Sequence, residues 1–440
     1  MIQPSPDSTV AYQPSLDQEY DVVVIGGGPA GSSTAALVAE YGHRVLLLER
    51  AAVPRFHVGE SLIPETYWPL KRLGLINRLK ESAFPRKFSV QFVSDGHKES
   101  APFYFDNYNP HESSVTWQVV RSEFDKMLLD RAVELGAVVH TSAHVQQVLF
   151  DGDAAVGVGC TVTNPDGVKQ DLTIKSKVVV DASGQSAFLS SRHGKRDRDP
   201  RLRKATVWSY FRGARRDDGR DEGATLIMQT EMKKSWFWYI PLPNNVVSVG
   251  CTGSLNYMFG DTRDPAKAFQ RELERCPAMQ ERLRDAERCE DFFTTRDFSY
   301  YAREGAGKGW LLVGDAFGFI DPVYSSGVYL ALKGGEFAAD AIHDALQRED
   351  LSGPRLGQWQ PLYKQGLENF RKLVYAFYTP GFSFGTFLKE HPQFKSNMVD
   401  ILVGDVFKPG VGDIFDAMGT VEPPLEAPAC DQPETAIAMA

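Results

Sequence analysis

Cysteine, long apolar runs and excess positive charge are all scarce in this chain, and each shortage excludes a class of protein. The 440 residues include five cysteines (160, 251, 276, 289 and 430) without CxxC spacing, so we expect buried or free thiols rather than a zinc site or disulfide framework. No apolar run reaches membrane-spanning length, and the N-terminus lacks the basic and apolar regions of a signal peptide. A formal net charge of −9 argues against nucleic-acid binding. We therefore expect a soluble, cytoplasmic protein without a metal site.

A dinucleotide-binding fingerprint follows an N-terminal tail, residues 1–19, that is expected to be disordered. An apolar strand-like run leads into Gly26-Gly27-Gly28-Pro29-Ala30-Gly31, a segment of helical composition follows, and a second strand ends at Glu49. Gly26 permits a tight turn, Gly28 lets the backbone approach a pyrophosphate, and Gly31 lets helix and strand pack closely. The helix start at Pro29 and Ala30 attracts phosphates, and Glu49 is expected to bind a ribose hydroxyl. This unit leaves FAD and NAD open.

Two later segments favour FAD. The apolar stretch 178–180 enters Asp181-Ala182-Ser183-Gly184, and the strand-like stretch 310–313 ends in Gly314-Asp315. A strand that ends in Gly-Asp resembles the FAD-binding pattern of the aromatic hydroxylase superfamily, which implies that Asp315 contacts the ribitol and Arg121 the flavin. The alternatives are a helix N-cap for Asp315 and a surface salt bridge for Arg121. No second GxGxxG is present, so reduced flavin is expected from a transiently bound nicotinamide or from another protein.

Four further motifs point to one family. They are the loop RFHVGESLIP at 55–64, the run WFWYIP at 236–241, the loop FIDPVYSSG at 319–327, and Lys87 in the alternating stretch 83–92. With these motifs the chain, over about residues 20 to 415, resembles the FAD-dependent halogenases, especially the branch that acts on phenolic, pyrrolic or carrier-bound aromatic substrates.

The resemblance implies a role for each motif. The residues implied to contact FAD are Gly26, Gly28, Pro29, Ala30, Gly31, Glu49, Arg50, Arg55, Arg121, Val145, Asp315 and Gly327. The small residues Ser325, Ser326 and Gly327 allow backbone N–H groups to converge on a halide ion, although a simple strand-to-helix turn is the alternative.

The run WFWYIP is expected to form a wall that shields the flavin from the substrate. Trp236 and Trp238, two residues apart on a strand, project to one face, and Pro241 is expected to end the strand. The alternative is an aromatic-rich core strand.

Lys87 aligns with the essential lysine of the family. Most lysines are solvated surface residues, which is the alternative for this one. Arg86 would point to the opposite face of a strand, and Lys71 is a competing candidate. Burial beside Phe84, Phe88 and Phe92 would lower the pKa of Lys87. A neutral amine could become a haloamine, whereas a cation could polarise hypohalous acid, and the sequence leaves both open.

The resemblance implies that reduced FAD, oxygen and chloride or bromide yield hypohalous acid, which passes to Lys87 for electrophilic halogenation of an electron-rich ring. The tryptophan-specific branch has a glutamate before its small-residue loop, but no acid lies between Asp321 and Ser325. Phenol-like or pyrrole-like substrates, free or carrier-bound, are therefore expected. The basic stretch 195–204 could dock an acidic carrier protein, although a solvated loop explains it equally.

Other functions share parts of these patterns. An FAD aromatic monooxygenase that consumes NAD(P)H is the main alternative, followed by an isoprenoid double-bond reductase and a non-catalytic FAD-binding module. The expected fold is α/β: a discontinuous Rossmann-like FAD-binding domain of the aromatic hydroxylase type (20–190 and 295–345) with an inserted β-rich substrate domain (200–295). A helical C-terminal region (346–418), in which 373–388 cover the substrate pocket, and a disordered tail (419–440) follow.

Overall fold

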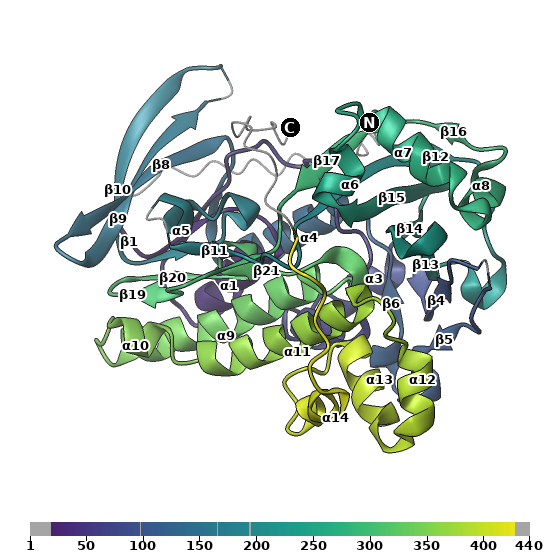
Figure 1. The fold of residues 1–440 in the computed structure, drawn as a ribbon. Coiled ribbons are helices and arrows are strands. Elements are labelled where there is room, and N and C mark those ends of the chain that lie inside the picture. Colours follow the sequence, from purple (N-terminus) through teal and green to yellow (C-terminus); the bar gives the residue numbers. More distant parts are fainter. Residues whose placement is uncertain (1–18, 97, 165, 193–194, 427–440) are drawn as a thin grey trace.

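A largely parallel sheet and a largely antiparallel sheet lie side by side above a layer of C-terminal helices (Figure 1). The computed structural model describes residues 19–96, 98–164, 166–192 and 195–426. Cys430 and most of the expected N-terminal tail therefore lie outside the described residues, while Cys160, Cys251, Cys276 and Cys289 are free thiols.

The parallel sheet contains the expected βαβ unit. Its central strands follow the order β20 (Trp310–Leu312), β10 (Lys169–Asp181), β1 (Glu19–Ile25), β2 (Val45–Leu48) and β7 (Val138–His140), all parallel to one another. β19 (Ala306–Gly307) adds an antiparallel edge, and β8 (Ala143–Asp151) and β9 (Ala154–Thr163) form a hairpin on β10. Because helices and this hairpin cover both faces, β2 and residues 22–25 of β1 are continuous apolar runs.

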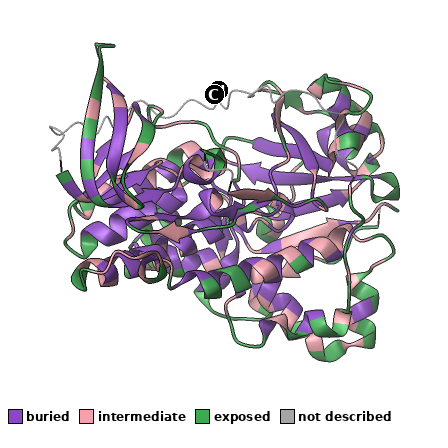
Figure 2. Ribbon diagram, turned by 60° about the vertical axis from the view of Figure 1, so that its left-hand side comes forward, coloured by how far each residue is buried: buried purple, intermediate pink, exposed green. Residues whose placement is uncertain are grey.

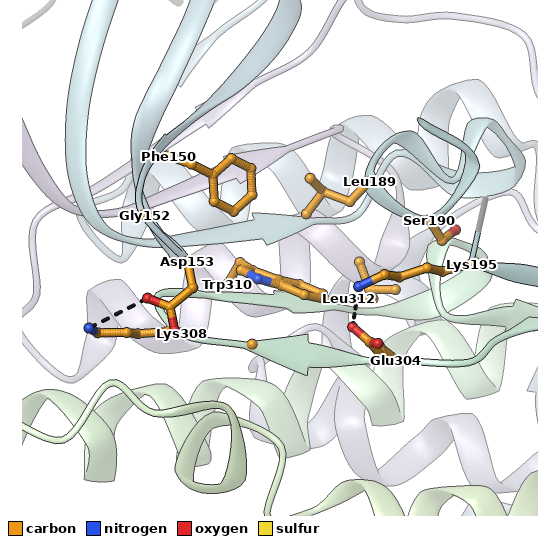
Figure 3. Close-up of a pocket in the computed structure, with 11 residues that line it drawn as sticks. Phe150, Gly152, Asp153, Leu189, Ser190, Lys195, Glu304, Lys308, Trp310 and Leu312 are labelled. Atoms are coloured by element: carbon orange, nitrogen blue, oxygen red, sulfur yellow. Dashed lines mark hydrogen bonds and ion pairs between the residues drawn. The ribbon is translucent and has the colours of Figure 1, made fainter. Parts of the chain in front are cut away.

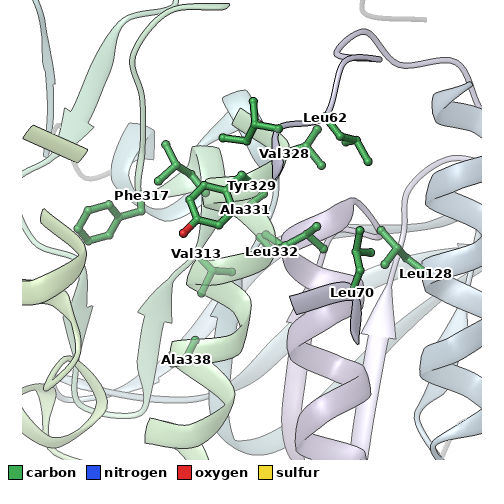
Figure 4. Packing of buried hydrophobic residues seen from close by; sticks show 14 of the residues in the cluster. Leu62, Leu70, Leu128, Val313, Phe317, Val328, Tyr329, Ala331, Leu332 and Ala338 are labelled. Carbon is green, nitrogen blue, oxygen red and sulfur yellow. The ribbon is translucent and has the colours of Figure 1, made fainter. Parts of the chain in front are cut away.

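Helices α1 (Pro29–Glu40), α4 (Arg121–Glu134) and α9 (Gly327–Gln347) pack together against this sheet. Their shared core includes Leu128 of α4, Val328 and Leu332 of α9, and Leu62 and Leu70 from the loop and helix that follow β2 (Figure 4). The start of α9 is thereby fixed against the 55–64 loop.

The second sheet follows the order β16 (Glu287–Arg288), β12 (Lys204–Arg212), β15 (Val246–Ser254), β14 (Ser235–Leu242), β13 (Thr225–Gln229), β4 (Ser89–Val93) and β5 (Phe103–Tyr104), with β17 (Phe293–Arg296) on β12. β4 and β5 come from the segment 20–190, so this sheet is not confined to the expected 200–295. The long-range parallel pairing of β4 with β13 leaves no local sequence signal.

Pro241 does not end its strand, in contrast to the prediction. β14 continues to Leu242, and Pro241 is paired with Val247 of β15. The reason is that β13 pairs with β14 only as far as Tyr239, so β14 has no second neighbour at Pro241 and needs no N–H there.

The C-terminal part is helical: α10 (Gly353–Leu356), α11 (Gln360–Tyr378), α12 (Phe384–Glu390), α13 (Lys395–Val403) and α14 (Ile414–Met418). Residues 419–426 were expected to belong to a disordered tail, but the structure gives them defined contacts. Residues 419–426 run back to β12, where Glu422 pairs with Arg201 and Glu426 pairs with Lys204. Residues 427–440 lie outside the described part of the chain. Figure 2 shows that buried residues dominate both sheets, while exposed residues gather on the outer helices and hairpin.

Candidate functional site

The glycine-rich turn between β1 and α1 has the geometry that a dinucleotide needs. Gly26 has φ +106°, and a Cβ there would lie 2.5 Å from the carbonyl oxygen of Ala182. A Cβ at Gly31 would lie 1.9 Å from the carbonyl oxygen of Gly26, so this helix can approach the strand only with glycine. Gly28 is open by contrast, with only Arg55 near a Cβ, at 3.8 Å. α1 begins at Pro29 without a side-chain cap, which leaves its first amides for an anion.

Glu49 lies beside this turn at the end of β2. Its buried carboxylate accepts hydrogen bonds from the N–H of Gly27 at 2.7 Å and the N–H of Ala51 at 2.9 Å, and it contacts Arg55 at 3.4 Å. Arg50 is exposed, and the Val145 side chain is buried in the core beneath the β8–β9 hairpin.

Two arginines from distant segments share one carboxylate. Arg121, at the start of α4, is 5% exposed and donates to both oxygens of Asp125 at 2.8 and 3.1 Å. Arg55 donates to the same carboxylate at 3.0 Å. Although burial alone would raise the pKa of Asp125, the two guanidinium groups hold it below its usual value. Arg121 also donates to the carbonyl of Val58 at 2.6 Å, so it is a buried structural arginine and not part of a surface salt bridge.

Asp315 lies in the middle of a single 3-10 turn (Gly314–Ala316) after β20 and caps no helix, so the N-cap alternative is wrong. Its side chain is half-buried, and none of the described residues donates a hydrogen bond to the carboxylate, although the backbone carbonyl of Asp315 accepts from Tyr300. Burial raises the pKa of Asp315 to about 7, against the opposing effect of Arg121. A carboxylate left without a donor beside Arg121 suits a ligand that carries hydroxyl groups. The residues present therefore fit FAD.

The 319–327 loop leads from β21 (Gly318–Phe319) into α9. Ser325 has φ +55°, and its N–H donates to the carbonyl of Pro322. In contrast to the expectation, this amide is therefore not available to a halide ion. Ser326 is the N-cap of α9, a helix of 21 residues that begins at Gly327. The side chain of Ser326 makes no capping hydrogen bond. The amides at positions 326 and 327 thus stand at the positive end of a long helix dipole.

The two indoles of β14 lie on one face, as the alternating pattern predicts. Trp236 and Trp238 belong to the core shared with α9, whereas Phe237 and Tyr239 belong to the core on the other side of the sheet. The two indole centroids are 6.2 Å apart, and both side chains are buried.

Each indole is also held by a hydrogen bond. Trp238 donates to the hydroxyl of Ser248 at 3.1 Å, and Trp236 donates to the hydroxyl of Tyr378 at 2.8 Å. Tyr378, the last residue of α11, donates in turn to Asp321 at 3.1 Å. The chain Trp236–Tyr378–Asp321 therefore ties the indole pair to the loop that precedes α9.

Lys87 is buried, with 2% of its surface exposed, while Arg86 is exposed on the opposite side of the two-residue strand β3 (Arg86–Lys87). The amine lies 2.8 Å from the hydroxyl of Ser61 and 2.9 Å from the carbonyl of Leu62. Burial lowers the pKa of Lys87 to about 7. The ring beside the amine is that of Phe105, with its centroid at 5.7 Å, which the sequence did not indicate.

Lys71 has a different setting. It is exposed on α2 (Tyr67–Arg72), where its amine lies over the rings of Tyr67 and Trp68. The geometry therefore favours Lys87 as the reactive amine.

The basic stretch 195–204 is not a free docking patch. Its cations are used inside the molecule: Lys195 pairs with Glu304, Arg198 and Arg203 with Asp297, Arg201 with Glu422 and Lys204 with Glu426. Arg196, the remaining basic residue of the stretch, lies over the ring of Tyr300.

A cavity of about 410 Å³ lies elsewhere, beneath the β8–β9 hairpin (Figure 3). Trp310, Phe150 and Leu189 line it, and the pairs Lys195–Glu304 and Lys308–Asp153 stand at its sides. None of the residues expected to contact FAD or the halide ion lines it, and neither do Lys87 and the indole pair. The chemistry of the side chains, and not the size of a cavity, locates the candidate site.

Comparison with known proteins decides the family. A family model described as FAD binding domain matches residues 19–334. The 1H-pyrrole-2-carbonyl-[peptidyl-carrier protein] brominase of Pseudoalteromonas luteoviolacea is 32% identical over 393 residues, which are 89% of this chain and 93% of that protein. The chain belongs to the flavin-dependent halogenases. The corresponding chlorinase of Pseudomonas fluorescens is 29% identical and aligns over 93% of this halogenase and 95% of its own length.

Solved structures agree with this assignment. The myxobacterial chondrochloren halogenase CndH is 35% identical, with a TM-score of 0.76 over 82% of this chain and 83% of that one. The flavin-dependent brominase Bmp2 is 29% identical, with a TM-score of 0.81 over 91% and 98%. In the described part of the halogenase, no helix combines the length and apolar character needed to cross a membrane.

Proposed function

We propose that this halogenase forms hypohalous acid from chloride or bromide at the start of α9 and uses Lys87 to deliver the halogen to an electron-rich aromatic ring. Reduced FAD, when bound with oxygen available, supplies the oxidising chemistry that this requires. The observation that carries the proposal is the buried amine of Lys87, whose partners are the Ser61 hydroxyl and the Leu62 carbonyl, together with the buried indole pair on one face of β14.

Separate groups of residues would bind FAD and the halide ion. The open backbone at Gly28, the amides at the start of α1, Glu49 and Asp315 would hold FAD through its phosphates and hydroxyl groups. Arg55 and Arg121 are fixed on this side of the site by Asp125, to which both donate. The amides of Ser326 and Gly327 would hold the halide ion.

The indole pair would keep the aromatic substrate away from the flavin. Trp236 and Trp238 cannot swing aside without breaking hydrogen bonds to Tyr378 and Ser248. A small oxidant could pass where an aromatic ring could not, which favours halogenation at Lys87 over direct oxygen transfer.

We propose a pyrrole-type ring bound to a carrier protein as the first substrate class to test. The two relatives named for carrier-bound pyrroles align over nearly their whole length, at 95% and 93%. By contrast, the sulochrin halogenase of Aspergillus terreus aligns over 66% of its length.

The test is intact-protein and small-molecule mass spectrometry after turnover with FAD, a flavin reductase, NADH, oxygen and bromide. Pyrrole and phenol rings are each offered free and attached to a carrier protein. We expect the bromine isotope pair on the carrier-bound pyrrole. A product with one added oxygen atom would contradict the proposal, and bromination of free phenols alone would reject the carrier-bound class. Omission of the reductase tests whether a separate protein must supply reduced flavin.

A further inference from the structure

Lys87 ends a buried chain of hydrogen bonds built from four separate segments. Its amine lies 2.8 Å from the Ser61 hydroxyl, which lies 2.9 Å from the Thr225 hydroxyl of β13. The side-chain amide of Gln118 donates to the Thr225 hydroxyl at 2.8 Å. The exposed fractions of Lys87, Ser61, Thr225 and Gln118 are 2%, 5%, 2% and 0%. The chain is therefore shielded from bulk water.

The amide of Gln118 can have only one orientation. Its NH₂ group lies 2.9 Å from the backbone carbonyl of Gly223, and a carbonyl can only accept a hydrogen bond. A flipped amide would place two acceptor oxygens against each other. The side-chain oxygen of Gln118 has no partner among the described residues, so the contacts of the NH₂ group alone fix the orientation. Gln118 is therefore a donor to Thr225.

This fixed donor sets the direction of the whole chain. Thr225 accepts from Gln118, and among the described residues its own proton has no acceptor other than the Ser61 oxygen. If Ser61 accepts that proton, its own proton has no acceptor among the described residues other than the amine of Lys87. A nitrogen can accept that proton only if it is a neutral amine, which still donates to the carbonyl of Leu62. A cationic Lys87 would have to donate to Ser61, and one hydroxyl proton would then lack an acceptor among the described residues.

We infer that Ser61, Thr225 and Gln118 are positioning residues that hold Lys87 as a neutral amine, the form that reacts with hypohalous acid. This inference rests on the proposed function and selects one of its two versions. In the selected step the lysine nitrogen attacks the halogen, the N–halogen bond forms as the halogen–oxygen bond breaks, and the leaving hydroxide takes the amine proton as water. The ring then takes the halogen and returns a proton, which restores the amine.

The charged groups on the surrounding segments do not oppose this arrangement. Asp106, next to Phe105, pairs with Arg220, and Asp221 accepts from Tyr104 at 2.8 Å and from Ser89 at 3.2 Å. Glu60, next to Ser61, accepts from Tyr210 at 2.6 Å. Arg86 points outward. None of these groups contributes to the pKa of Lys87, which burial alone lowers to about 7.

The test is the titration of Lys87 by NMR in the full chain with oxidised FAD bound. Protein is labelled with ε-¹³C lysine, and the Lys87 signal is assigned by its loss in Lys87→Arg. We expect the parent to titrate near pH 7. Thr225→Val breaks the chain and should raise the midpoint by about one pH unit, because Ser61 is then free to accept from a cation. Thr225→Ser keeps the hydroxyl and should leave the midpoint unchanged.

Gln118→Met, which removes the fixed donor and leaves Thr225 in place, should also raise the midpoint and serves if Thr225→Val does not fold. A parent midpoint in the ordinary lysine range would overturn the inference. So would equal midpoints for Thr225→Val and Thr225→Ser. The titration needs neither halide nor substrate, so these outcomes would leave the proposed halogenation standing. The proposed halogenation itself is contradicted only by the product analysis described above.

Discussion

The flavin side and the lysine side of the halogenase handle buried charge in opposite ways. On the flavin side, Glu49, Arg55, Asp125 and Arg121 form a connected set of ion pairs in which each charge has an opposite neighbour. On the lysine side, the partners of Lys87 are a hydroxyl and a carbonyl, and no carboxylate contributes to its pKa.

The difference explains what each side can do. Compensated charges stay ionised and rigid, which suits the binding of an anionic cofactor. An uncompensated amine loses its proton near neutral pH, which suits nucleophilic chemistry. In the proposed function, the indole pair of β14 separates these two electrostatic environments. Each prediction below tests one half of this contrast or the boundary between them.

The largest effect is expected from Lys87→Ala. We expect halogenation to fall by about a thousandfold or more, because the buried amine of the lysine side is gone, while FAD binding and peroxide release persist. Product formation, FAD retention and peroxide are measured together. Lys71→Ala, which removes an exposed lysine of α2, is the matched control. Loss of product in the control and retention in Lys87→Ala would transfer the role to Lys71.

Removal of the shared carboxylate should be the most damaging change on the flavin side. Asp125→Ala leaves Arg55 and Arg121 without their common partner, so we expect a loss of about 3–5 kcal/mol in the free energy of unfolding. Urea denaturation followed by circular dichroism measures it. Asp130→Ala, which breaks the Lys126–Asp130 pair on the same helix, should cost less than about 1 kcal/mol. Equal losses would mean that the buried pairs are no more important than surface ones.

Lys87→Met should stabilise the protein, in contrast to Asp125→Ala. The unfolded chain titrates Lys87 at its ordinary value of 10.5 and the folded protein at about 7, so between these values the unfolded state binds more protons and stability rises with pH. The cost of the buried cation is therefore complete below about pH 7. We expect a gain of about 2 kcal/mol near pH 6 that shrinks toward pH 10, measured by urea denaturation at each pH. A gain independent of pH would show that packing, and not charge, is responsible.

The sequence predicted features that depend on neighbours along the chain. The glycine turn, the start of α1 and the acid at the end of β2 follow local rules, and alternation along a strand correctly placed Arg86 and Lys87 on opposite faces. The resemblance supplied the significance of Lys87 and of the indole pair.

Features that depend on distant contacts were not predictable. Phe105, Thr225 and Gln118 reach Lys87 only because β4 pairs with β13 and Gln118 bridges to Ser61. Pro241 was misread because the end of β13 decides whether its missing N–H matters. The sequence did not predict that the Ser325 amide is used in a local turn, because a serine gives no sign of the φ of +55° that this turn requires.

The smallest expected effect concerns the boundary itself, at Tyr378. Tyr378→Phe removes the acceptor of the Trp236 indole and a donor to Asp321, whose pKa burial raises to about 7. We expect a loss of about 1–3 kcal/mol in stability and a few-fold rise in peroxide released per halogenated product, because a looser indole no longer separates the two environments. Tyr375→Phe, on the same helix, breaks only the bond to Asp199 and is the control. If both variants release the same excess of peroxide, the effect comes from α11 as a whole, and the hydrogen bond between Tyr378 and Trp236 does not maintain the boundary.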